Sequence, residues 1–224
     1  FLHFDLRRMT ISQHHQVIEI CRDLHRQGFL AAADGNISFL ANTNLFITPS
    51  GAAKAHIQPD ELAELGLDGS VIRGQPSSER LLHLMVYTQC PQARAVIHAH
   101  PPCAIAFSIA NPELNWLPEG AMSELILAVG KVPIVPYARP GTIDLAESIR
   151  PFLPDNRTMI LSRHGVLCWG ESLREAQNGV ERVEHAAKVL GLATQMGGIS
   201  VLSDDEISAL KAMRKQLGNL CLIA

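Results

Sequence analysis

A chain of 224 residues has the length of one globular domain, and with 47% hydrophobic and 18% charged residues it is too apolar to be disordered. Its 19 basic and 22 acidic residues give a net charge of −3, so it lacks the basic excess that binds nucleic acid, and no apolar stretch is long enough to span a bilayer. We therefore expect neither nucleic acid nor a membrane as a partner, which leaves room for a small phosphorylated ligand.

The first ten residues lack the layout of a signal peptide, because their charges follow the apolar residues. We expect residues 1–8 to be a poorly ordered lead, with Met9 as an alternative start, to one domain that spans 1–224 without repeats or linkers. The cysteines are odd in number, widely spaced and without a Cys-x-x-Cys pair, which is typical of buried thiols in a reducing cytoplasm. They are Cys21, Cys90, Cys103, Cys168 and Cys221.

The first part of the chain is predicted to be a helix followed by a hairpin. Apolar residues at helical spacing indicate a helix that is capped at Thr10 or Ser12 and ended by Gly28. Two short strands at 36–40 and 45–48 enclose a turn, which is the pattern of a hairpin.

The middle of the chain alternates helices and strands. A leucine-rich helix opens near Pro76 and runs to Gln89, and an apolar segment with β-branched residues predicts a strand at 94–98. The pair Pro101-Pro102 ends this strand and begins the next helix. A further strand is expected at 131–135.

The last part contains a helix over 143–152, strands at 158–162 and 166–169, a long helix over 173–190 and a helix capped at Ser203. Short strands mixed with longer helices predict an α/β or α+β protein. The hairpin near the start argues against an all-parallel sheet.

Two histidines at alternating positions are the first sign of chemistry. In a strand, the side chains of His98 and His100 lie on one face, so both rings can bind one divalent metal. The alternative is a pair of buried histidines that bond only to backbone groups. His164 lies at another predicted strand end, and three histidines with one open position form the pattern of a catalytic zinc site.

Small polar residues gather at three predicted turns. Ser77 and Ser78 precede Glu79 at a helix start, where the carboxylate offsets the helix dipole and free N–H groups can bind an anion. The turns at 35–36 and 48–51 are also able to direct N–H groups at a phosphate. Each of these segments taken alone is better explained as an ordinary turn or helix cap.

The order of these motifs resembles the class II aldolase/adducin family, and within it the L-fuculose-1-phosphate aldolases. The motifs that carry the resemblance are 34–38, 47–51, 76–79, 96–100 and 163–165. The resemblance implies a three-layer α/β/α sandwich with a largely antiparallel or mixed central sheet. It also implies a homotetramer with active sites between neighbouring subunits.

The resemblance assigns roles to site residues. It implies Zn2+ held by His98, His100 and His164, with Mn2+, Co2+ or Fe2+ as alternatives that the same ligands accept. It makes Glu79 the catalytic acid and base. It places the substrate phosphate at Asn36, Ser50, Gly51, Ser77 and Ser78.

The implied reaction cleaves a ketose 1-phosphate, such as L-fuculose 1-phosphate or a 5-modified pentulose 1-phosphate. The products are dihydroxyacetone phosphate and a short aldehyde, formed through a metal-stabilised enediolate. The same family and fold also include epimerases, dehydratases, decarboxylases and adducin-like modules without activity. The retained metal ligands argue against the last of these.

The chain departs from the fuculose phosphate aldolases where the aldehyde half of the substrate binds. Met122 occupies the position of a tyrosine that donates a proton, fifteen residues before Tyr137. Arg214 and Leu217 stand where their C-terminal tail carries aromatic residues. An apolar Met122 would suit a less polar aldehyde.

The missing tyrosine leaves the proton donor open among Glu119, Glu124 and Tyr137, and Glu119 is the first candidate. The other histidines fall mostly on predicted helices and are expected to be surface or packing groups. They include His14, His15, His25, His56, His83 and His185.

Overall fold

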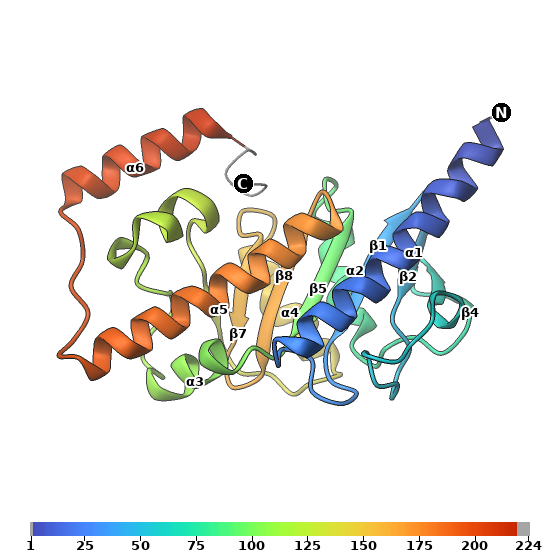
Figure 1. Cartoon of the computed structure of the whole chain (residues 1–224), viewed down its shortest axis with the longest axis horizontal. Coiled ribbons are helices and arrows are strands. Elements are labelled where there is room, and N and C mark those ends of the chain that lie inside the picture. The colour runs from blue at the N-terminus through green and yellow to red at the C-terminus, as the bar shows by residue number, and fades with distance from the viewer. Residues whose placement is uncertain (1, 219–224) are drawn as a thin grey trace.

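The computed structural model describes residues 2–218, with side chains from residue 12 onward (Figure 1). Within these residues one sheet of eight strands forms the centre of the molecule. All neighbouring strands are antiparallel except β6 and β7, so the predicted mixed sheet is confirmed. In spatial order the strands are β4 (Val71–Arg73), β3 (Ala63–Gly66), β2 (Asn44–Ile47), β1 (Asn36–Ala41), β5 (Ala95–Ala99), β8 (Gly165–Gly170), β7 (Thr158–Leu161) and β6 (Ile134–Val135).

Helices cover both faces of this sheet, which confirms the three-layer sandwich. One face carries α1 (Leu2–Arg26), α3 (Pro102–Ala110) and α5 (Leu173–Gln195), and the other carries α2 (Arg80–Gln89) and α4 (Ile143–Ile149). The last helix, α6 (Asp204–Leu217), packs against a π-helical segment, Leu125–Val129. In Figure 1, α1 and α5 cross in front of the sheet.

Alternation along the central strands divides the core into two layers. Ile97 of β5 and Val166 of β8 pack with α1, α3 and α5, whereas Val96 and Leu167 pack with α2 and α4. All four side chains are fully buried, which is expected for central strands that are covered on both faces. The side chain of His98 follows Ile97 and therefore belongs to the α2 side of the sheet.

Several predicted elements differ from the structure. The helix α1 begins at Leu2, so a start at Thr10 or Ser12 is wrong, because residues 2–9 contain neither proline nor glycine to stop a helix. The strands β3 and β4 were not predicted. Both lie at one margin of the sheet. The three side chains of β4 are exposed and so lack an apolar alternation, whereas β3 alternates buried and half-buried residues over only four positions, which is at the lower limit of a recognisable strand pattern.

Other predicted features agree with the described residues. The helix α6 is capped as expected, since Ser203 Oγ accepts a hydrogen bond from Glu206 N. The cysteines within residues 12–218 are free thiols, and Cys221 lies outside the described residues. Among the helices of residues 2–218, none combines the length and the apolar character needed to cross a membrane. The organisation as one domain with a lead of residues 1–8 stays a prediction.

Candidate metal centre

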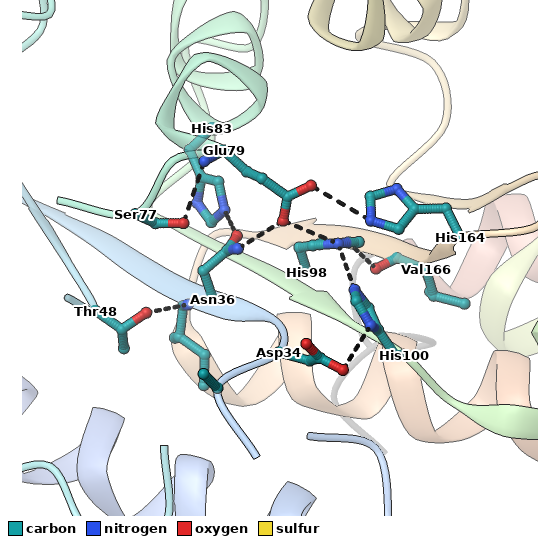
Figure 2. A network of polar contacts seen from close by, with 12 residues as sticks. Asp34, Asn36, Thr48, Ser77, Glu79, His83, His98, His100, His164 and Val166 are labelled. Carbon is teal, nitrogen blue, oxygen red and sulfur yellow. Dashed lines mark hydrogen bonds and ion pairs between the residues drawn. The ribbon is translucent and has the colours of Figure 1, made fainter. Parts of the chain in front are cut away.

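The two central strands and their ends bring three histidines together. His98 lies within β5, His100 directly follows that strand, and His164 lies in the turn that joins β7 to β8. Because β5 pairs with β8, the end of one strand lies beside the start of the other. Figure 2 shows the three rings pointing toward one another, with Glu79 above them. Ring centroids are 4.7–5.0 Å apart.

Glu79 completes the cluster from the start of α2. Its Oε2 is 3.3 Å from His98 Nε2, and its Oε1 is 3.3 Å from His164 Nε2. His98 Nε2 and His100 Nε2 are 3.0 Å apart. One nitrogen or oxygen from each of the four residues lies within 4.8 Å of all the others. Residues that are 85 positions apart in the chain thus form one compact donor set.

The hydrogen bonds of this cluster favour a cation at its centre. His98 Nδ1–H donates to Val166 O at 3.0 Å, so Nε2 of the neutral ring carries a lone pair. Asp34 Oδ2, 3.7 Å from His100 Nδ1, favours the proton on that nitrogen and leaves a second lone pair on Nε2. The two lone pairs then face each other beside a carboxylate, which is unfavourable unless a positive charge lies between them.

Burial keeps these imidazoles neutral and ready to act as ligands. Burial lowers the pKa of His164 to about 4. Burial also holds the pKa of His98 well below its usual range, with the neighbouring His100 and His164 adding to the effect. Burial also lowers the pKa of His100, against the opposing effect of Asp34. The opposite holds for the Glu79 carboxyl, whose pKa is raised by burial, while the hydrogen bond from Asn36 lowers it.

Two buried atoms of the cluster lack a hydrogen-bond partner. Among residues 12–218, Glu79 Oε1 and His164 Nδ1 are buried without a hydrogen bond. Such groups usually mark the place of an ion or a water molecule. Three imidazole nitrogens and one carboxylate oxygen are a donor set that Zn2+ accepts, so the residues present fit a divalent metal.

Close approach of the strands depends on Gly165. A Cβ atom at this position would lie 2.4 Å from Ala99 O and 2.9 Å from ring carbons of both His98 and His100. Only a residue without a side chain lets the β7–β8 turn carry His164 this close to β5.

The expected phosphate residues lie beside this cluster. A bridge between Pro49 and Pro76, with a 3.0 Å hydrogen bond from Ser50 N to Gln75 O, holds the turn at 48–51 against the segment that leads into α2. Ser77 Oγ accepts from Glu79 N at 3.2 Å, and Asn36 Nδ2 donates to Glu79 Oε2 at 2.9 Å. Ser78 and Gly51 are exposed next to these groups. Phosphate binding here stays a prediction.

The expected proton donors are not part of this cluster. Glu119 lies in a short 3-10 segment, Glu119–Ala121, and forms a 2.6 Å ion pair with Lys211 of α6. Tyr137 follows β6 and is 61% exposed. In residues 12–218, no hydrogen bond or ion pair joins either side chain to Glu79 or the three histidines, so a single chain does not bring them to the centre.

The three replaced positions of the aldehyde side lie elsewhere as well. Met122 and Leu217 line a cavity of about 1260 Å3 beside α5. Arg214 Nη1 donates to Ile126 O at 2.9 Å and so ties α6 to the π-helical segment.

His83 was expected to be a surface or packing group, and the structure shows it buried with polar contacts that the sequence did not predict. It is fully buried in α2, and its Nε2 and Nδ1 lie 2.5 Å from Asn36 Oδ1 and 2.6 Å from Ser38 Oγ. Its position four residues after Glu79, on the same face of a helix, was the signal that could have identified it.

Known proteins resemble this chain in sequence and in fold. The model of the class II aldolase and adducin N-terminal domain family matches residues 15–190. An L-fuculose phosphate aldolase of Methanocaldococcus jannaschii is 35% identical over 78% of this chain and 93% of its own length. A 3-oxo-tetronate 4-phosphate decarboxylase of Escherichia coli is 30% identical over 93% of this chain and 99% of its own length. The crystal structure of YgbL from Escherichia coli, described as an aldolase, epimerase or decarboxylase, superimposes with a TM-score of 0.85 at 30% identity, over 91% of this chain and 99% of YgbL.

Proposed function

The chain belongs to the class II aldolase and adducin family, and from that premise we propose that it is a zinc-dependent aldolase that cleaves a ketose 1-phosphate. The products would be dihydroxyacetone phosphate and a short aldehyde, with L-fuculose 1-phosphate or a 5-modified pentulose 1-phosphate as substrate. The observation that carries this proposal is the Glu79 carboxylate, 3.3 Å from two of three converging imidazoles. It sets a proton-transfer group beside a cation site, which is the combination that chemistry next to a carbonyl requires.

The three histidines would hold the metal. His98, His100 and His164 supply neutral nitrogen donors, which suit zinc and also accept Mn2+, Co2+ or Fe2+. A bound divalent metal supplies a Lewis acid that polarises the substrate carbonyl.

Glu79 would transfer the proton at the carbon next to the carbonyl. Its Oε2 is held by Asn36, whereas Oε1 is buried without a hydrogen bond, so Oε1 is the atom we assign to this step. In cleavage Glu79 gives the proton to that carbon, and in the aldol direction it removes the proton.

The substrate phosphate would bind at the turns beside Glu79. Asn36, Ser50, Gly51, Ser77 and Ser78 offer amide and hydroxyl donors and no charge that would compete with the metal. Binding energy gained at this remote group orients the bond that breaks.

The proton on the hydroxyl of the leaving aldehyde needs another group, for which we propose Glu119 or Tyr137. Since neither reaches the cluster within one chain, this assignment requires a neighbouring subunit, and we propose a homotetramer with active sites between subunits. We place the protein in the cytoplasm, where phosphorylated sugars are available and buried thiols such as Cys168 stay reduced.

Decarboxylation of a phosphorylated 3-oxo acid is the second candidate. In aldol cleavage a base must take the proton from the hydroxyl whose carbon becomes the aldehyde. The loss of carbon dioxide from a 3-oxo acid has no such proton to remove, so it tolerates Met122 in place of the tyrosine. It is favoured by the decarboxylase of Escherichia coli, which aligns with 93% of the chain, against 78% for the aldolase from Methanocaldococcus jannaschii. Epimerisation and dehydration use the same metal and Glu79, but no further observation favours them.

A substrate panel with quantified metal tests these proposals. The zinc-loaded protein is incubated with ketose 1-phosphates and with 3-oxo-tetronate 4-phosphate, and dihydroxyacetone phosphate and carbon dioxide are measured separately. We expect dihydroxyacetone phosphate from a ketose 1-phosphate, lost in Glu79→Gln. Carbon dioxide alone would establish the second candidate, and an isomer or a dehydrated ketone would reject both. A protein that binds no stoichiometric metal would be an adducin-like module.

A further inference from the structure

A chain of buried polar side chains runs from Tyr87 to Glu79. Tyr87 OH is 2.9 Å from Ser38 Oγ, which is 2.6 Å from His83 Nδ1. His83 Nε2 is 2.5 Å from Asn36 Oδ1, and Asn36 Nδ2 is 2.9 Å from Glu79 Oε2. Glu79, His83 and Tyr87 recur every four residues along one face of α2, and Asn36 and Ser38 alternate along β1 beneath it. Figure 2 shows the inner part of this chain.

Because Glu79 is negatively charged, each hydrogen bond between Tyr87 and Glu79 in this series has a defined donor and acceptor. An ionised carboxylate only accepts, so the amide atom of Asn36 that faces it is the NH2 group. Asn36 Oδ1 therefore faces His83 and accepts from Nε2–H. Burial lowers the pKa of His83 to about 3, so the ring is neutral and Nδ1 accepts from Ser38. Ser38 then accepts in turn from Tyr87.

We propose that His83 is a positioning residue, which fixes the side-chain amide of Asn36 so that only N–H donors face Glu79. This inference rests on the proposed role of Glu79 as the proton-transfer group. With Oε2 held in this way, the second carboxylate oxygen is directed toward His164. Without the donor from His83, the amide can turn and place its oxygen against the carboxylate, which displaces Oε1 from its reacting position.

Two substitutions of similar size and polarity separate this role from simple packing. His83→Gln carries an N–H donor to about the position of Nε2, whereas His83→Asn reaches only the position of Nδ1. Both side chains are neutral, so neither adds a charge to the core. The pair thus differs mainly in whether Asn36 Oδ1 keeps its donor.

The direct readout is the side-chain amide of Asn36, observed by NMR in the full-length metal-free and zinc-loaded protein. Its resonances are assigned by their loss in Asn36→Ser. In the wild type and in His83→Gln we expect slow exchange of this amide with solvent, and in His83→Asn we expect exchange that is faster by about 10-fold or more. Unchanged protection in His83→Asn would overturn the proposal whatever reaction the protein catalyses.

The second readout is turnover of the substrate that the panel identifies. In His83→Asn the Asn36 amide is free to turn, and its hydrogen bond to the charged Glu79 is then lost, so we expect kcat to fall about 10- to 100-fold. Bound zinc should be unchanged, and His83→Gln should recover kcat to within about 3-fold. Equal kcat in His83→Asn and wild type would overturn the proposal. Should His83→Asn fail to fold, Ser38→Ala frees Nδ1 and lets the ring exchange tautomers, and unchanged protection of Asn36 there would overturn it equally.

Discussion

The three histidines of the site, His98, His100 and His164, form one side of it, which we call the histidine wall. They lie on or beside the two central strands of the sheet, whereas the groups expected to act on the leaving aldehyde lie in loops near the edge of the sheet. His98 is held in β5 and His164 in the turn into β8. Their positions are fixed because β8 is paired with β5 on one side and with β7 on the other. Tyr137 follows β6, the two-residue strand at the margin, and Glu119 pairs with α6. One chain therefore brings together the residues that would hold the metal, but it does not bring Glu119 or Tyr137 to them. We therefore predict that a single subunit can bind the metal, whereas the leaving-group chemistry that we propose needs a residue from a neighbouring subunit.

The largest effect is expected from His98→Ala. This change removes a ligand at the most buried point of the wall, so we expect loss of stoichiometric zinc and a fall in turnover of about 1000-fold or more. Metal quantification and kinetics on the same preparation test this. His56→Ala, at an exposed histidine outside the cluster, is the control and should keep metal and activity. Full zinc occupancy in His98→Ala would mean that the rings do not form the metal site.

The next largest effect is expected from Glu79→Gln. Glutamine keeps the size of the side chain and can still bond to Asn36 through its oxygen, but it cannot exchange a proton at Oε1. We expect kcat to fall about 100-fold, with zinc content and thermal stability close to those of the wild type. Wild-type turnover in this variant would remove Glu79 from the mechanism while leaving the metal site intact.

The same contrast explains how far the sequence could be read. Alternation within β5 and the motif order predicted that His98 and His100 lie on one side of the sheet. This prediction is local, because it depends only on how side chains alternate along a single strand. The placement of Glu119 depends on an ion pair with Lys211, 92 positions later in the chain, which no local pattern encodes. His83 was missed because a buried polar group on a helix has the same spacing as a packing residue.

Acid is expected to weaken the fold through the histidine wall more than through the loops. The pKa of His164 is about 4 in the folded chain and near 6.5 when unfolded, so between these values only the unfolded chain takes up the proton. Stability is therefore complete above pH 6.5 and is lost as the pH falls toward 4. For the metal-free protein we expect a Tm lower by about 5 °C or more at pH 4.5 than at pH 7. His164→Gln should reduce this difference, and an unchanged Tm in the wild type would show that the wall is not neutral.

The smallest effect is expected on the loop side, from Glu119→Gln. If Glu119 acts only on the substrate hydroxyl whose carbon becomes the aldehyde, its loss should lower the rate of aldol cleavage about 10-fold. Decarboxylation of a 3-oxo acid should be unchanged, because that reaction releases carbon dioxide and has no such hydroxyl to deprotonate. Lys211→Met is the matched control, since it breaks the same half-exposed ion pair but keeps the carboxylate, and an exposed pair of this kind contributes little to stability. A selective loss in Glu119→Gln would assign the loop to catalysis. Equal, small losses in both variants would mean that Glu119 only anchors α6, and would leave Tyr137 and Glu124 as the remaining candidates.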